Sequence, residues 1–207
     1  MEPESDDPRR YERIAPRPPE GQIDLRTIFD ADAPVAAVEL DVGFGRGGSV
    51  FSRARTAPEA FVLGVEIKAK WATKVDQRRA RLGLERVCIW AADIRPLLAR
   101  LGPDAILQRV FVHFPDPWWK KRHQKRRVLT SRLLDELGRL MRVGGELFVQ
   151  TDVPDRHALY VDTIDAHAAF ELRDAALGEN PFGAISNRER RAEEDGLPVH
   201  RLLAVKR

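Results

Sequence analysis

AAVELDVGFGRGG, at residues 36–48, is the part of the sequence that most clearly indicates the fold. Its first seven residues are mostly apolar and predict a buried strand, which the glycines that follow bring to an end. Gly43, Gly45 and Gly48 have the spacing of a loop that turns sharply and lets a ligand approach its backbone closely. Such a loop joins a strand to a helix in doubly wound α/β sheets, so this stretch predicts both a fold and a ligand site.

The same alternation of strand and helix continues along the chain. Further apolar runs predict strands at 61–66, 87–93, 105–113 and 146–150. Amphipathic stretches predict helices at 68–82, 94–101, 129–142 and 154–168. Residues 170–177 and 198–205 predict two last strands with no clear helix between them, as in an antiparallel pair. We expect one Rossmann-like α/β domain: a doubly wound, mostly parallel sheet with helices on both faces and an antiparallel C-terminal edge pair.

Composition indicates a single soluble domain. The chain has 207 residues, a formal net charge of +3 and one cysteine, Cys88, so no internal disulfide can form. No apolar run approaches the roughly 18 residues of a membrane span, so no membrane partner is expected. The acidic N-terminus does not resemble a signal peptide, and we expect a cytoplasmic protein.

The N-terminal segment differs from the rest in composition. Residues 1–22 are charged and rich in proline, which predicts a flexible arm or a strap lying over the domain. The α/β domain is then expected to occupy residues 23–207.

Five acidic residues fall at or just beyond predicted strand ends: Asp41, Glu66, Asp93, Asp116 and Asp152. One such acid alone would more simply be a turn or helix cap. Because ligands of a parallel sheet bind at the carboxyl ends of its strands, five together indicate one binding site.

The nature of the ligand follows from the charges around the glycine loop. The loop, with Glu66 about 20 residues later as a ribose-binding acid, would also fit a dinucleotide such as NAD. Asp41, however, places an anion where a pyrophosphate would lie, whereas a sulfonium and an ammonium group would be attracted to it. Asp93 suits the amino group of an adenine. The loop therefore favours S-adenosylmethionine, with an NAD-dependent oxidoreductase as the alternative.

The most informative stretch is HFPDPWWKKRHQKRR, at residues 113–127. Two prolines bracket Asp116 and restrict its backbone, so its carboxylate is held in place. Trp118 and Trp119 offer flat faces that either stack on a base or pack in the core. Six lysines and arginines within 120–127 favour phosphate binding over a merely solvated helix start.

This segment closely resembles the signature of the bacterial tRNA (guanine-N7)-methyltransferases. The resemblance extends through residues 40–45, 64–67, 92–93 and 151–152, and covers the chain from about residue 38 onward. It implies a class I methyltransferase fold, S-adenosylmethionine as cofactor and tRNA as partner. The implied reaction is methyl transfer to N7 of a guanine in the tRNA variable loop.

The resemblance also implies roles for individual residues. Cofactor contacts fall on Asp41, Glu66, Asp93 and Asp116, to which the loop adds Gly43 and Gly45. Contacts to tRNA fall on Lys120 and Asp152, and a Thr-x-x-Glu element of the family aligns with Ser186, Asn187, Arg188 and Glu189. The chain departs from the family pattern at Asp41, usually glutamate; at Trp119, commonly proline; at Ser186, usually threonine; and at Arg188, usually aromatic or apolar.

The chemistry of guanine N7 indicates which groups the enzyme needs. N7 carries a lone pair and no proton, so attack on a sulfonium methyl requires alignment and no general base. A fixed carboxylate would favour the positive charge that the purine gains, a catalytic role we assign to Asp116, with Asp152 and Glu189 as further guanine or ribose contacts. The five histidines are too scattered to predict a metal site.

Two alternatives to this function use the same fold. One is an S-adenosylmethionine-dependent methyltransferase with a different acceptor, which would leave the basic cluster at 120–127 without a role. The other is a non-catalytic RNA-binding module, against which the four intact cofactor acids argue.

Overall fold

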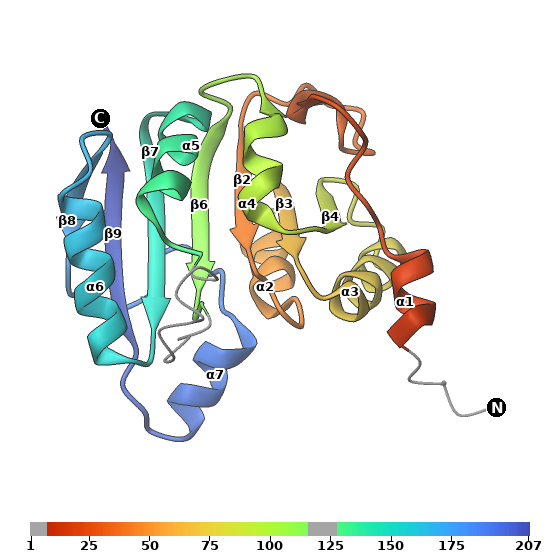
Figure 1. Cartoon of the computed structure of the whole chain (residues 1–207). Helices are drawn as coiled ribbons and strands as arrows, with labels where there is room; N and C mark the ends of the chain where they lie inside the picture. The colour runs from red at the N-terminus through yellow and green to blue at the C-terminus, as the bar shows by residue number, and fades with distance from the viewer. Residues whose placement is uncertain (1–7, 116–127) are drawn as a thin grey trace.

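A computed structural model describes residues 8–115 and 128–207 of the chain. Seven strands of these residues form one sheet in the order β4-β3-β2-β6-β7-β9-β8 (Figure 1). Their bounds are β2 Val38–Val42, β3 Phe61–Glu66, β4 Val87–Ala91, β6 Leu107–His113, β7 Met141–Thr151, β8 Phe170–Asp174 and β9 His200–Lys206. Strands β2, β3, β4, β6 and β7 are parallel, whereas β9 is antiparallel to both β7 and β8. The expected mostly parallel sheet with an antiparallel edge pair is confirmed.

Helices cover both faces of the sheet. One face carries α4 (Ile94–Leu97), α5 (Ser131–Leu140) and α6 (Pro154–Asp165), and the other carries α2 (Gly48–Thr56) and α3 (Ala69–Arg81) (Figure 1). Helix α5 shows why: its leucines at 133, 134, 137 and 140 recur with the helical period and are all buried. The described part of the chain also has short 3-10 turns at Leu25–Thr27 and Leu98–Arg100 and a two-strand ladder of β1 (Ile23–Asp24) with β5 (Leu101–Gly102).

One further helix lies where the sequence predicted none. Helix α7 (Asn187–Glu194) separates β8 from β9, so the expectation of two strands without a helix between them was wrong. Its sequence, NRERRAEE, holds a single apolar residue, Ala192, and therefore has no apolar stripe to reveal it. A capping box does mark its start, because the Ser186 hydroxyl and the Glu189 carboxylate each accept a hydrogen bond from the other's backbone N–H.

The N-terminal segment is held against the edge of the domain from residue 8 onward. Helix α1 (Pro8–Ile14) packs on α3 and buries Tyr11. Beyond the helix, the Pro16 carbonyl accepts a hydrogen bond of 2.6 Å from the Ala91 N–H, and Arg17 donates to the Ala91 carbonyl at 3.2 Å. This described part lies as a strap against the end of β4; the division of the chain at residue 22 stays a prediction.

Strand β2 marks the point where the order in which strands are added to the sheet reverses. The chain proceeds from β2 through β3 to β4 on one side, and then crosses to β6 and β7 on the other. In open α/β sheets this switch point opens a crevice at the carboxyl ends of the strands. The carboxyl ends of β2, β3, β6 and β7 all lie at the edge where α7 is seen in Figure 1. Over the described ranges, no helix is long and apolar enough to cross a membrane.

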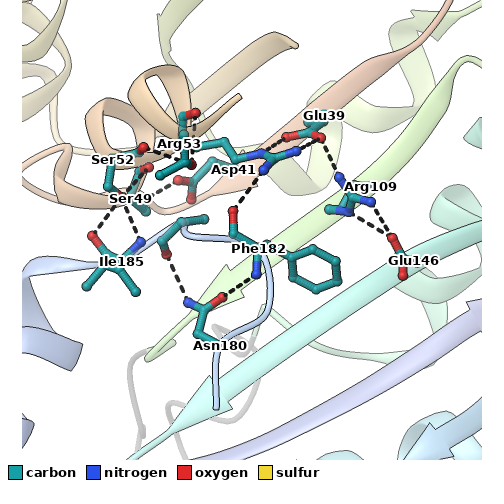
Figure 2. Close-up of polar contacts among 12 residues, drawn as sticks. Glu39, Asp41, Ser49, Ser52, Arg53, Arg109, Glu146, Asn180, Phe182 and Ile185 are labelled. Carbon is teal, nitrogen blue, oxygen red and sulfur yellow. Dashed lines mark hydrogen bonds and ion pairs between the residues drawn. The ribbon is translucent and has the colours of Figure 1, made fainter. Parts of the chain in front are cut away.

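A partly buried ion network centred on the buried Glu39 joins the central strands beneath α2. Figure 2 shows Glu39 of β2 between two guanidinium groups: Arg53 of α2 donates to it twice at 2.7 Å, and Arg109 of β6 donates at 2.6 Å. Arg109 also pairs with Glu146 of β7, and Arg53 donates to the Phe182 carbonyl at 2.8 Å. The network thus ties three strands, one helix and the chain segment before α7 into one layer.

Candidate active site

A cavity of about 960 Å³ opens at the carboxyl ends of the parallel strands. Its described lining comes from six places that are far apart in the sequence: residues 42–46, 65–68, 92–95, 112–115, 152–153 and 186–188, together with Val128. The cavity therefore lies at the switch point of the sheet, where the sequence predicted a ligand.

The glycine loop forms one wall of the cavity with its backbone. Gly43 and Gly45 have φ angles of +72° and +58°, a left-handed conformation that favours glycine, and a Cβ on either would meet nothing within 4 Å. Glu66, at the end of β3, fixes the loop by accepting hydrogen bonds of 2.9 Å from the N–H groups of Gly45 and Lys68. The loop is thus held open on the side where a ligand would approach.

Asp41 lies beneath this loop instead of in the described lining. The side chain is buried, and its Oδ2 accepts a hydrogen bond from the Ser49 hydroxyl, as Figure 2 shows. Its Oδ1 is also buried and has no hydrogen-bond partner within the described part of the chain. Burial, together with the nearby charge of Glu66, raises the pKa of Asp41 to about 7. Asp41 is therefore a carboxylate with an unused acceptor next to the cavity.

Asp93 lines the cavity after β4 and begins helix α4. Its carboxylate accepts hydrogen bonds from the Arg95 N–H at 3.0 Å and from the Arg95 Nε at 2.9 Å. These hydrogen bonds, the one to the guanidinium foremost, lower the pKa of Asp93. The residue is thus an ionised helix cap at the cavity edge.

Two predicted substrate residues, Asp152 and Arg188, pair with each other across the cavity. Arg188 donates from Nε to the Asp152 Oδ2 at 3.0 Å, and its Nη2 contacts the same oxygen. The pair connects the end of β7 to the first turn of α7. The resemblance implies an aromatic or apolar residue at position 188, and a side chain of that kind could not form this ion pair.

Of the four residues at 186–189, three line the cavity and the fourth is buried. Ser186, Asn187 and Arg188 line the cavity, and the Asn187 side-chain oxygen accepts a hydrogen bond of 2.9 Å from the Gly48 N–H. Glu189 does not line the cavity: it is completely buried. It accepts hydrogen bonds from Gln150 at 2.8 Å and Arg201 at 3.0 Å. Its predicted substrate contact stays untested, while its structural role is to anchor α7.

One lining residue, His113, was not singled out from the sequence. It is the last residue of β6, is buried at the cavity wall, and its Nδ1 lies 2.7 Å from the Gln150 Nε2. In the sequence it counted only as one of five scattered histidines. Its position at a strand end, directly before the family segment, was the signal that could have distinguished it.

The predicted residues Asp116 and Lys120 lie outside the described residues, as do Trp118, Trp119 and the rest of the basic cluster. Within the described ranges, no group of three or more histidine, cysteine or acidic side chains could hold a metal ion.

The sheet and the cavity define the class of protein. A glycine loop after the strand at the switch point, with acids at the ends of the next two strands and a reversed last strand pair, is the arrangement of class I methyltransferases. The solved structure of the 16S rRNA methyltransferase KamB superimposes with a TM-score of 0.60 over 88% of this chain and 91% of that chain, at 19% identity. TrmN from Thermus thermophilus gives a TM-score of 0.59 over 86% of this chain and 46% of that chain, at 19% identity. At these identities the likeness shows the fold.

Sequence comparison narrows the class to a family. A family model described as "Putative methyltransferase" matches residues 35–202. The tRNA (guanine-N(7)-)-methyltransferase of Trichormus variabilis is 36% identical over 191 residues, which are 89% of this chain and 87% of the relative. The one from Rhodopirellula baltica is 35% identical over 195 residues, 89% of this chain and 70% of the relative. The chain belongs to the tRNA (guanine-N7)-methyltransferase family, which removes the dinucleotide alternative.

Proposed function

We propose that the protein transfers a methyl group from S-adenosylmethionine to N7 of a guanine in the variable loop of tRNA. The observation that carries the proposal is the cavity itself, in a chain of this family. It brings the glycine loop, Glu66 and Asp93 together with Asp152 and the start of α7. The first three would face the cofactor, and the last two would face the base.

The residues present fit S-adenosylmethionine. The open backbone of Gly43 and Gly45 leaves room for a close ligand, and the unused Oδ1 of Asp41 lies beneath it. A buried carboxylate of this kind is stabilised by a cation and not by a pyrophosphate. Glu66 and Asp93 supply acceptors for ribose hydroxyls and an adenine amino group. The cofactor, when bound, supplies an electrophilic methyl group on a positively charged sulfur.

Methyl transfer requires that the guanine N7 be aligned with the methyl group and that the positive charge gained by the purine be stabilised. The guanine N7 lone pair forms the new bond to the methyl carbon while the sulfur–carbon bond breaks, so no proton has to be removed. The purine gains the positive charge that the sulfur loses. Asp116 would stabilise that charge, and Asp152, held by Arg188, would accept from the guanine N1–H and amine. Lys120 and its basic neighbours would hold tRNA phosphates.

The experiment that tests this function is methyl transfer from labelled S-adenosylmethionine to unmodified tRNA transcripts, followed by nucleoside analysis. N7-methylguanosine at one site is the expected product. Transfer to another nucleoside, or none despite measurable cofactor binding, would overturn the proposal. The variant Asp116→Asn should stay folded and lose most single-turnover activity; a wild-type rate would remove Asp116 from the catalytic role.

A further inference from the structure

The side chain of His113 is oriented by a relay of groups on neighbouring strands. Gln150 of β7 lies beside His113 of β6, and Arg201 of β9 lies beside Gln150, as the strand register requires. The Arg201 Nε donates to the Gln150 Oε1 at 3.2 Å, and the Gln150 Nε2 donates to the Glu189 Oε2 at 2.8 Å. Arginine can only donate and a carboxylate can only accept, so the Gln150 amide can lie in one orientation alone.

The orientation of Gln150 determines where His113 carries its proton. The Gln150 Nε2 has a second hydrogen, and the His113 Nδ1 lies 2.7 Å away. Because that contact needs an acceptor, Nδ1 holds a lone pair and the proton of the neutral ring is on Nε2. Burial lowers the pKa of His113 to about 4 against the opposing charge of Glu189, so the ring is neutral at pH 7.

The Nε2–H is then a donor without a partner. Nε2 is buried and has no hydrogen-bond partner within residues 8–115 and 128–207. A buried polar group left without a partner costs stability, and a bound ligand or an ordered water can satisfy it. His113 lines the cavity beside Phe114 and Pro115, at the start of the segment expected to act on the base. Because His113 is a lining residue, a substrate that enters this end of the cavity is one source of the missing acceptor.

We propose that His113 is a specificity-determining residue whose Nε2–H donates a hydrogen bond to the O6 carbonyl of the target guanine. The inference rests on the proposed function. O6 lies next to N7 on the same edge of guanine, and adenine carries a donor amino group at the corresponding position. A fixed donor here accepts guanine and rejects adenine, because two facing donors leave both unsatisfied.

A neutral donor suits the reaction better than a charged one. The guanine ring gains positive charge as the methyl group arrives, and an imidazolium beside it would oppose that change. Burial keeps the His113 ring uncharged, and the Gln150 amide keeps its proton on the side of Nε2. The relay from Arg201 thus has a role in substrate choice besides anchoring α7.

The first arm of the test determines the tautomer directly. In the folded protein labelled with ¹⁵N-histidine, long-range proton–nitrogen correlation distinguishes protonated from unprotonated ring nitrogens. The His113 signals are those absent from the spectrum of His113→Phe. We expect a protonated Nε2 and an unprotonated Nδ1 at pH 7, unchanged down to about pH 5. A protonated Nδ1, or an imidazolium at pH 7, would overturn the proposal without any assay of activity.

The second arm measures specificity on tRNA carrying either guanine or 2-aminopurine at the target position. 2-Aminopurine keeps N7 and the 2-amino group but lacks O6 and the N1–H, so the effect of O6 is read from the difference between the wild type and the His113 variant. His113→Phe keeps a ring beside Phe111 without a donor, and should lower kcat/KM on guanine tRNA roughly 10- to 100-fold. It should change kcat/KM on 2-aminopurine tRNA by less than about two-fold, so the preference for guanine falls by the same factor.

Two comparisons keep the second arm interpretable. His113→Gln retains an amide donor and should recover part of the guanine preference, and both variants should bind S-adenosylmethionine as the wild type does. An unchanged preference in His113→Phe would overturn the role of His113 alone. Absence of N7-methylguanosine with the wild-type protein would instead overturn the proposed function.

Discussion

At the scale of single residues, the buried carboxyl group of Asp41, next to the cavity, lowers the stability of the fold when it ionises. Its carboxyl group is buried with one oxygen unpartnered among the described atoms, which raises its pKa to about 7. In the unfolded chain the same group ionises near pH 4. Between these values the folded protein holds a proton that the unfolded chain has released, so stability falls as pH rises from about 4 to about 7. A bound cation would relieve this penalty.

The variant Asp41→Asn should therefore change the pH dependence of stability. Without cofactor, we expect its Tm to match that of the wild type near pH 4 and to exceed it by several degrees at pH 8. Asparagine can still accept from the Ser49 hydroxyl but carries no charge to desolvate. Its affinity for S-adenosylmethionine should fall about 10-fold at pH 8. Thermal unfolding and calorimetry at both pH values check this, and a Tm difference that does not vary with pH would contradict it.

At the scale of elements, the start of α7 is attached to the start of α2. The Asn187 side-chain oxygen accepts from the Gly48 N–H, and a Cβ on Gly48 would lie 2.7 Å from the Asn187 backbone nitrogen. The polar helix α7 thus docks through caps, close backbone approach and the buried Glu189. The glycine loop and α7 form one cavity wall only while this contact is kept.

The variant Gly48→Ala should separate these two elements. The added methyl group has no room unless α7 moves, so we expect a lower Tm and about 10-fold weaker binding of S-adenosylmethionine. Gly178→Ala is the matched control, because a Cβ at Gly178 would meet nothing within 4 Å. Calorimetric titration and thermal unfolding of both variants provide the comparison. Equal behaviour of the two would show that α7 is free to shift without harm to the site.

At the scale of the whole molecule, the ion network around Glu39 holds the central strands against the segment before α7. Glu39 is 4% exposed and is shared by Arg53 and Arg109. Removing the charge of Glu39 takes a carboxylate away from both Arg53 and Arg109 in a poorly solvated layer, although Arg109 keeps its pair with Glu146. No member of the network lines the cavity, so its contribution is to stability.

The variant Glu39→Gln should lower the free energy of unfolding by about 3 kcal/mol. Glu171→Gln, which removes an exposed pair with Arg173, should change it by less than about 1 kcal/mol. Denaturant unfolding measures both changes. Methyl transfer at low temperature should be near normal in both variants, and a folded but inactive Glu39→Gln protein would place the network in the reaction.

The basic cluster at 120–127 is proposed to bind tRNA, an interaction that involves the whole molecule. Replacing two of its cations with glutamine should reduce the slope of log affinity against log salt by about 0.7 to 0.9 for each phosphate that is no longer neutralised. Arg55 and Arg81, exposed near the far ends of α2 and α3, provide a matched pair of control substitutions. Filter binding over a range of salt concentrations checks the prediction. An unchanged slope would mean that the cluster binds no tRNA phosphates.

The sheet, the glycine loop and the acids at the strand ends could be predicted from the sequence, because apolar periodicity and glycine spacing are local patterns. The capping box at Ser186 and Glu189 was equally local, yet the absence of an apolar stripe concealed the helix that it begins. Only the three-dimensional structure shows that Glu189 is buried, that Asp152 pairs with Arg188, and that the Gln150 amide faces the His113 Nδ1. Each depends on groups 12 to 51 residues apart, which meet only when the strands pair. Burial and partner geometry, which no local pattern encodes, then set charge and tautomer.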